Sequence, residues 1–454
     1  MTPEPGSPSR RALLRGAGLV LGTSAVTLAG ARLAGLWHRL PPFLLSEGVA
    51  VGPDGVLRAL PVGSRLVYEP GTRVPTADSD PATMPDSGRR ALVDAARSRR
   101  SGAILPDGPW RDLADGALDD LLALTSPVLA QDGAPAVEYP AGSVIAGPVG
   151  IWRYTWPRDA AFTAVALAAA GLEEEALTVL ERLASLLGQD GAFQARYTAD
   201  GGVPDARSPQ TDGTGWFLWA AGRVLPGPVG TRRTPPAPSA HLRAALTRAA
   251  ARLLALTDGD DRLPASSPDY WEVEEDRLTL GTAAPVLLGL EAASRLAAAG
   301  VLVGSVGREG LSGRCREVRT AVEDAFEPGW GRHAGGDDVD AAICWVLPPF
   351  TEPLAGALEA RGTLLTRLAR GSGGLAPGSS WRDDGVSWTP ETALVGWSAR
   401  TLSLESEEEQ LRDWLAASRT AVGALPEKVA ATGAPAGPAP LAWTCALVVL
   451  AACG

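Results

Sequence analysis

Lysine is almost missing from this sequence of 454 residues. Lys428 is the only one, and arginine supplies the rest of the 41 basic residues. With 52 acidic residues the formal net charge is −11. This balance argues against a surface that follows nucleic-acid phosphates, because such a surface needs clustered basic side chains. We therefore expect no nucleic-acid partner.

Histidine and cysteine are also scarce, and their spacing argues against a metal site. His38, His241 and His333 lie far apart, and the four cysteines form no CxxC pair. Zinc sites need several such ligands at close spacing, so we expect no metal ligands. The phosphate-binding motifs GxxxxGK(S/T) and GxGxxG are missing as well. We therefore expect no nucleotide cofactor.

The first 31 residues have the pattern of an export signal. Arg10-Arg11 precedes an uncharged run from Gly16 to Ala31, which ends in the small-residue pattern Ala29-Gly30-Ala31. The arginine pair resembles a twin-arginine signal. We expect this signal to be cleaved at Ala29-Gly30-Ala31. An exported protein, extracellular or on the cell surface, is predicted. The alternative is an uncleaved anchor that ends near Trp37, which would be the chain's contact with a membrane.

The rest of the chain divides into two parts. Residues 32–109 alternate short apolar segments with turn signals such as Gly52-Pro53-Asp54-Gly55, which predicts a lead segment with short strands and a helix over 88–100. From residue 110 to 454, apolar residues recur at three- and four-residue spacings, without clear strands between them. The spacing predicts twelve helices, over 110–124, 159–170, 173–187, 213–225, 239–257, 281–298, 308–327, 338–347, 354–370, 389–403, 406–421 and 439–452.

Twelve helices can pair as six hairpins. The links after the odd-numbered helices then all emerge at one end, because the helices of a hairpin are antiparallel. These are the long links of this chain, over 125–158, 188–212, 258–280, 328–337, 371–388 and 422–438. The sequence therefore predicts an all-α, six-hairpin toroid with one elaborate end.

Tryptophan is unusually common, with 14 residues against 5 tyrosines and 6 phenylalanines. A tryptophan in a link often closes the core. Several at one end favour a sugar instead, because sugar CH faces stack on flat rings. The tryptophans of this end are Trp152, Trp156, Trp271, Trp330, Trp381 and Trp388 in the links, and Trp216 and Trp443 just inside helices.

Three segments carry residues suited to chemistry. In 152–159, Arg158 can bind neighbouring hydroxyls and Asp159 can cap a helix, or the two can form a structural ion pair. In 269–275, Glu272 follows Trp271, a placement that can keep a carboxyl protonated as a general acid, although four acids in seven residues also suit a solvated turn. In 425–429, Glu427 is an isolated acid next to Lys428. It is either a functional residue or one half of a surface ion pair.

In this order, the segments resemble glycoside hydrolase family 15, the glucoamylase-like inverting exo-α-glucosidases, including glucodextranase-type members. The resemblance extends from about Trp110 to Cys453. Its motifs are Val137–Asp159 with Ala160-Ala161-Phe162-Thr163, Gln210–Trp216, Tyr270-Trp271-Glu272, Asp338–Ala342, Leu425-Pro426-Glu427 and Pro440–Trp443. The family's fold is the (α/α)6 barrel, in agreement with the helix count.

The resemblance implies a role for each of these residues. Glu272 would protonate the glycosidic oxygen, and Glu427 would activate a water on the opposite face of the sugar. The non-reducing terminal glucose of a short oligosaccharide would be held without cofactor or metal. Its binding residues would be Tyr154, Trp156, Arg158, Asp159, Asp212, Trp271, Trp388 and Trp443.

The sequence also departs from the family pattern. Val273 stands where many glucoamylases have a second glutamate, Ser380-Trp381 replaces an expected Arg-Tyr pair that Arg382 could complement, and Trp152 stands where a tyrosine is common. The linkage stays open between α-1,4, α-1,6 and the α,α-1,1 bond cleaved by trehalases. A phosphorylase and a non-catalytic glycan-binding protein are the alternative functions. A monomer is expected.

Overall fold

The computed structural model describes residues 42–79, 84–131, 133–225, 237–303 and 308–454. The chain divides into two units, Met1–Pro42 and Phe43–Gly454, and all elements below belong to the second. The export signal predicted over residues 1–31 and the alternative anchor ending near Trp37 lie outside the described residues.

A small sheet and one helix precede the helical region. The sheet has the order β1-β2-β3-β4, from β1 (Gly48–Val51), β2 (Leu57–Leu60), β3 (Val128–Gln131) and β4 (Ala134–Glu138). The helix predicted over 88–100 is confirmed as α2 (Asp86–Arg100). The expectation that no strands separate the later helices is wrong, because β3 and β4 form a hairpin inside the first long link and join the lead segment's strands.

The twelve predicted helices correspond to observed elements, with two departures. The eighth is the short 3-10 helix η2 (Ala341–Val346), and the ninth is divided into α10 (Ala357–Arg361) and α11 (Leu364–Leu368). A further short 3-10 helix, η1 (Gly150–Arg153), precedes the second helix. The other helices are α3 (Arg111–Leu124), α4 (Pro157–Ala169), α5 (Glu173–Leu186), α6 (Asp212–Val224), α7 (Ala240–Leu256), α8 (Leu280–Ala298), α9 (Arg308–Phe326), α12 (Thr389–Thr401), α13 (Glu405–Ala417) and α14 (Ala442–Cys453).

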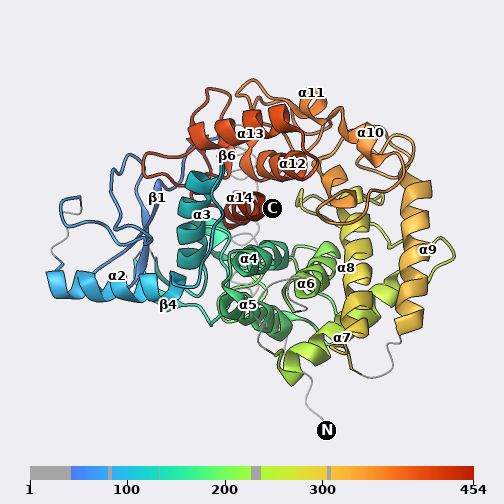
Figure 1. The fold of residues 1–454 in the computed structure, drawn as a ribbon, viewed down its shortest axis with the longest axis horizontal. Coiled ribbons are helices and arrows are strands. Elements are labelled where there is room, and N and C mark those ends of the chain that lie inside the picture. Colours follow the sequence, from blue (N-terminus) through green and yellow to red (C-terminus); the bar gives the residue numbers. More distant parts are fainter. Residues whose placement is uncertain (1–41, 80–83, 132, 226–236, 304–307) are drawn as a thin grey trace, which may run out of the picture. The chain divides into compact units, whose positions relative to one another are not determined.

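Six of these helices form a closed inner ring. The helices α4, α6, α8, η2, α12 and α14 contact one another in that order, and α14 contacts α4 to close the ring. All of them except η2 are labelled in Figure 1. They are buried on almost every side, as their apolar sequences require. The amphipathic helices α3, α5, α7, α9 and α13, with the α10–α11 pair, pack outside them. The fold is therefore an (α/α)6 barrel, as expected.

Small residues allow the inner helices to approach closely. A β-carbon at Gly215 of α6 would lie 2.1 Å from the Pro285 carbonyl oxygen of α8. At the same crossing, a β-carbon at Gly289 of α8 would lie 2.8 Å from the Gly215 Cα. Only glycine fits at such a distance, so the Gly213-Thr214-Gly215 motif positions α6 against α8.

The six long links meet at one end of the barrel, as the helix count predicted. In the structure they cover residues 125–156, 187–211, 257–279, 327–340, 369–388 and 418–441, and we number them first to sixth. Hydrogen bonds or strand pairing connect each link region to the next around the ring. These contacts are Thr155 with Tyr197, Thr211 with Ser267, Leu278 with Ala334, Val339 with Ser379, Trp388 with Lys428, and Ala146 with Ala442.

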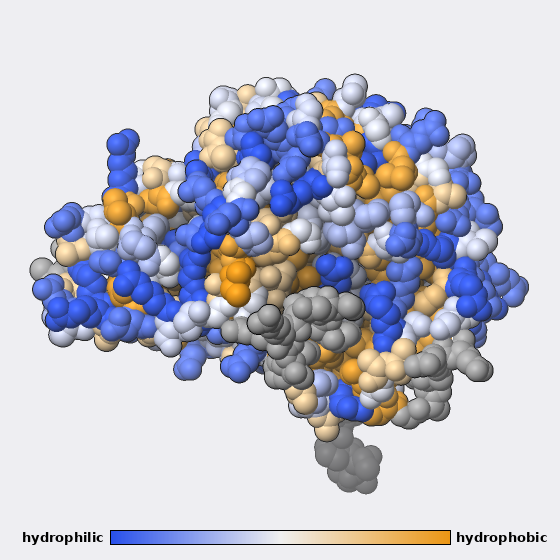
Figure 2. Space-filling view, viewed as in Figure 1, coloured by the Kyte–Doolittle hydropathy of each residue, from blue (hydrophilic) through white to orange (hydrophobic). Residues whose placement is uncertain are grey.

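The surface drawn in Figure 2 is mostly hydrophilic, with hydrophobic residues in small separate patches. None of the helices that the structure describes is long and apolar enough to cross a membrane. Cys315, Cys344, Cys445 and Cys453 are all free thiols.

Candidate active site

The inner helices begin at the end of the barrel where the long links meet, and four of them carry a buried acid at their start. Asp159 lies in the first turn of α4, Asp212 begins α6, Asp340 caps η2, and Glu391 lies in the first turn of α12. All four are less than 5% exposed. The expected capping role of Asp159 is not found, because α4 starts at Pro157 without a side-chain cap.

Arg158 connects this acidic cluster to Glu272. Its Nη2 lies 3.6 Å from Asp159 Oδ2 and 3.6 Å from Glu272 Oε1, and its Nη1 lies 3.4 Å from Asp212 Oδ2. The guanidinium also lies over the Trp443 ring, 4.9 Å from its centroid. One arginine thus holds residues of α4, α6, the third link and α14 together.

Burial dominates the protonation of the two aspartates. It raises the pKa of Asp159 to about 6 and that of Asp212 to about 7, against the opposing attraction of Arg158. Asp159 Oδ2, Asp212 Oδ1 and Arg158 Nε have no hydrogen-bond partner among the described residues. Buried polar atoms without partners are rare in native proteins, and a cluster of them is typical of a site for a polar ligand.

Glu272 lies at the tip of the third link in a left-handed conformation, with φ of 59°. Its Oε1 accepts hydrogen bonds from Trp156 Nε1 at 3.1 Å and from Gln210 Nε2 at 2.8 Å, and its Oε2 pairs with Arg207. Sequence reasoning expected an apolar environment created by Trp271. The structure instead places hydrogen-bond donors and cations around this carboxylate.

The third link is held by a buried arginine that the sequence analysis did not identify. Arg332 binds Asp269 at 2.9 Å, Glu275 at 2.6 Å and Asp340 at 3.0 Å. Its guanidinium lies 3.7 Å from the centroid of the Trp271 ring. Asp269 in turn accepts two backbone hydrogen bonds. The Trp271 N–H donates to its side-chain carboxylate, and the Glu272 N–H donates to its backbone carbonyl.

Glu427 lies in the sixth link, beside the short strand β6 (Lys428–Val429), and is 8% exposed. Its Oε1 accepts a hydrogen bond from Trp152 Nε1 at 3.2 Å, and its Oε2 lies 3.1 Å from Lys428 Nζ. The predicted Glu427–Lys428 ion pair therefore exists, but it is largely buried rather than on the surface.

The two glutamates enter from opposite sides of the ring. Glu272 belongs to the link that precedes α8, and Glu427 to the link that precedes α14, which are the third and sixth helices in the order of inner contacts. Asp159 interacts electrostatically with both of them. Single displacement at a sugar carbon requires two carboxyl groups on opposite faces of the sugar.

The remaining predicted binding residues lie around these groups. Trp156 and Tyr154 flank the buried Arg196 guanidinium, which is 5.1 Å from each ring centroid. Trp271 packs edge-on against Trp381 at 4.8 Å, and Trp381 against Trp388 at 5.5 Å.

Two tryptophans expected at this end belong to the core instead. Trp216 and Trp330 are fully buried, and the Trp330 indole N–H is satisfied by the Ala355 carbonyl.

Sequence reasoning gave no role to Arg207, Arg332 or Glu391. Arg207 and Arg332 could not be distinguished in the sequence from the many other arginines, because arginine supplies nearly all the positive charge. Glu391 follows Thr389-Pro390, and an acid after such a helix start is typical of an ordinary first turn.

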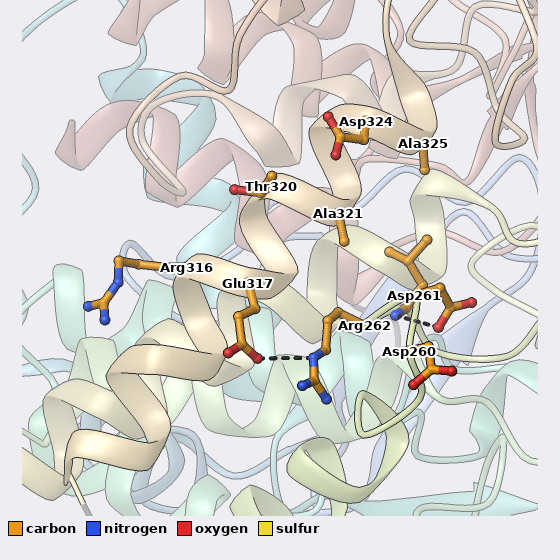
Figure 3. Close-up of a pocket in the computed structure, with 10 residues that line it drawn as sticks. Asp260, Asp261, Arg262, Arg316, Glu317, Thr320, Ala321, Asp324 and Ala325 are labelled. Carbon is orange, nitrogen blue, oxygen red and sulfur yellow. Dashed lines mark hydrogen bonds and ion pairs between the residues drawn. The ribbon is translucent and has the colours of Figure 1, made fainter.

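Two surface hollows lie away from the glutamates. The larger, about 730 Å³, lies between α9 and the third link, where Arg262 pairs with Glu317 at 3.1 Å (Figure 3). The smaller, about 360 Å³, is lined by Tyr139, Arg153 and Tyr154 among others. Neither contains Glu272 or Glu427. Within the described part of the chain, no cluster of three metal-ligating side chains is found.

Comparison with known proteins supports the fold. No protein-family model and no curated protein sequence matches the chain. Among solved structures, a wild-type glycosidase matches with a TM-score of 0.61 at 19% identity, over 76% of this chain and 96% of that one.

Two glucoamylases match in the same way. A bacterial glucoamylase complexed with acarbose has a TM-score of 0.59 at 15% identity, over 81% of this chain and 59% of that one. The glucoamylase from Saccharomycopsis fibuligera has a TM-score of 0.56 at 13% identity, over 78% and 96%. The resemblance seen in the sequence thus extends to the structure, and the chain has the six-hairpin (α/α)6 fold of these glycosidases and glucoamylases.

Proposed function

We propose that the protein is an inverting exo-α-glucosidase that releases glucose from the non-reducing end of short α-glucosides. The observation that carries the proposal is the pair of carboxylates, Glu272 and Glu427, which come from opposite sides of the inner ring. The sugar-like ligands of similar folds agree with it, because one neighbouring glycosidase is in complex with glucose and one glucoamylase with acarbose.

The proposed sugar pocket lies among Arg158, Asp159 and Asp212. Each of these side chains has a buried polar atom without a hydrogen-bond partner in the described protein, so each can bond a sugar hydroxyl without losing an existing hydrogen bond. Trp443 closes the pocket beneath Arg158. The buried start of the inner helices would accept only a chain end, which supports exo action.

The reaction proceeds by one displacement. Glu272 gives its proton to the glycosidic oxygen while the bond from that oxygen to C1 breaks. Glu427 takes a proton from a water molecule whose oxygen forms the new bond to C1 from the opposite face, so the configuration inverts. Arg207 pairs with Glu272 in the structure, and we expect the leaving-group sugar to take the place of this contact.

Proton NMR of the products tests this proposal. The full chain is mixed with maltose, isomaltose, trehalose and short maltooligosaccharides. β-Glucose should appear before α-glucose, and the fastest substrate identifies the linkage. Appearance of α-glucose first would exclude inversion. A requirement for phosphate would favour the phosphorylase alternative, and sugar binding without cleavage would favour the glycan-binding one.

Substitution of each glutamate then tests the roles. Glu272→Gln and Glu427→Gln should each lower kcat by orders of magnitude and leave glucose binding in place. Glu274→Gln is the matched control, because Glu274 lies in the same link, is exposed, and bonds only Ser208 at 2.9 Å among the described hydrogen bonds. Unchanged turnover in the Glu427 variant would remove the proposed base.

Export is the second part of the proposal, and it depends on the sequence of residues 1–31. Replacement of Arg10-Arg11 by two lysines should retain the protein in the cytoplasm if the twin-arginine pattern is read. Unchanged export of this variant would argue for another route.

A further inference from the structure

We propose that Glu391 is a sugar-binding residue whose carboxyl bonds a hydroxyl of the glucosyl unit held between Glu272 and Glu427. The proposal rests on the proposed function, and it adds a contact on the side of the ring opposite Asp159 and Asp212. It stands on the position of Glu391 in the ring, its burial, and the absence of a hydrogen-bond partner for its Oε2 among the described residues.

The position follows from the order of the inner helices. Between α8 and α14, one arc of the ring contains α4 and α6, which carry Asp159 and Asp212. The other arc contains η2 and α12, which carry Asp340 and Glu391. A glucosyl unit has hydroxyls around its whole ring, so a pocket that grips it needs polar groups on both arcs.

Of the two acids on the second arc, Asp340 is fully occupied within the protein. It accepts bonds from Tyr270 and from the backbone N–H of Ala342, and it pairs with Arg332. Glu391 differs, because its Oε2 is buried and has no hydrogen-bond partner among the described residues. Nor does its carboxylate form an ion pair with any described residue.

Contacts near the start of α12 tie Glu391 to the base. The backbone N–H of Thr389 donates to the Glu427 carbonyl at 3.1 Å, and Trp388 pairs with Lys428. The charges of Glu427, Asp340 and Arg158 all act on the Glu391 carboxyl. The side chain therefore lies within electrostatic range of the base and of the arginine that holds the opposite wall.

Burial favours the neutral form of a carboxyl, and it raises the pKa of Glu391 to about 8 against the opposing effects of the Glu391 backbone N–H and of Arg158. At neutral pH the group therefore keeps its proton and can donate a hydrogen bond. The titratable or charged groups that face it are Glu427 of the sixth link, Asp340 of η2, Arg158 of α4 and Tyr270 of the third link.

Kinetics with deoxy substrates test the contact directly. The wild type, Glu391→Gln and Glu391→Leu are compared on p-nitrophenyl α-glucoside and its four monodeoxy analogues. Glu391→Leu should lower kcat/KM for the parent glucoside by about 10- to 100-fold, the value of one buried hydrogen bond. The same substitution should cost less than about 3-fold with the one analogue that lacks the bonded hydroxyl. Equal losses with all five substrates would overturn the proposal.

Glucose binding gives a second readout that does not depend on turnover or on the apolar variant. Tryptophan fluorescence should show wild-type affinity for glucose falling above about pH 8, when Glu391 ionises and can no longer donate. Glu391→Gln stays neutral, so its affinity should lack this decline, and a decline of equal size in both proteins would overturn the proposal. If wild type binds glucose but cleaves no glucoside, the hydrolase proposal fails while the Glu391 contact is still tested by this measurement.

Discussion

The backbone of Gly437 lies directly against the Glu427 carboxylate. A β-carbon at Gly437 would be 2.6 Å from Glu427 Oε2 and 2.9 Å from its Cβ, and Gly437 has φ of 76°. Only glycine tolerates both the contact and the left-handed backbone. The residue after Gly437 also bonds to Glu427, because the Glu427 N–H donates to the Pro438 carbonyl at 2.9 Å. Gly437 therefore fixes the position of the proposed base.

Gly437→Ala should displace Glu427 and lower kcat/KM about 10- to 100-fold, because catalytic groups act only at their aligned positions. Gly433→Ala is the matched control. Gly433 lies in the same link with φ of 85°, and a β-carbon there meets nothing within 4 Å. Both variants should lose about 1–2 kcal/mol of unfolding free energy from the left-handed backbone. Equal activity in the two variants would contradict the role given to Gly437.

Trp152→Phe should misalign the proposed base, Glu427, without weakening sugar binding. The substitution keeps an aromatic ring and removes the N–H that donates to Glu427 Oε1 at 3.2 Å. This N–H holds the Glu427 carboxyl in its orientation, and catalytic groups act only when they are aligned, so kcat should fall about 10- to 100-fold. Trp414→Phe also loses one indole hydrogen bond, to the Ser372 carbonyl at 2.7 Å, but Trp414 lies on the outer helix α13 and its N–H donates to no proposed site residue. It should lose stability and keep kcat, and a drop in kcat in this control would point to general loosening of the fold.

Arg332→Met should destabilise the whole barrel end. The substitution leaves Asp269, Glu275 and Asp340 without their common buried cation, and breaking a buried ion pair costs about 3–5 kcal/mol. Denaturant unfolding measures this change. Arg58→Met, which breaks an exposed pair with Asp54 at 2.6 Å, should cost less than about 1 kcal/mol. Similar losses in both variants would show that the buried network adds no special stability.

The sequence predicted the barrel well because helix spacing and link lengths are local properties. Apolar periodicity located α5, α7 and α12 closely, and the alternation of long and short links predicted that the long links meet at one end. It failed where tertiary contacts override the pattern. Residues 338–347 form only the short η2, where Asp340 caps the first turn and pairs with Gly378.

The candidate site was predictable only where a motif was available. Glu272, Glu427 and Arg158 stand in recognisable segments. Arg332 and Glu391 do not, because their roles depend on packing between links that are far apart in the chain. The environment of Glu272 also depends on Arg207, which comes from a different link and which neighbouring residues in the sequence do not indicate.

The buried aspartates predict a pH dependence of stability with a definite sign. Burial raises the pKa of Asp212 from its ordinary value of 3.8 to about 7. Between these two values the folded protein holds a proton that the unfolded chain has released, so this residue makes the free energy of unfolding decrease as pH rises. Asp212→Asn removes the ionisation. The stability of the variant relative to wild type should therefore increase from about pH 4 to about pH 7 and then level off.

Asp54→Asn is the control with the opposite sign, because the hydrogen bond from Arg58 lowers the pKa of Asp54. Its stability relative to wild type should stay constant above about pH 5. Urea unfolding of the three proteins at pH values across this range measures both curves, and a flat difference for Asp212→Asn would mean that Arg158 keeps Asp212 ionised throughout.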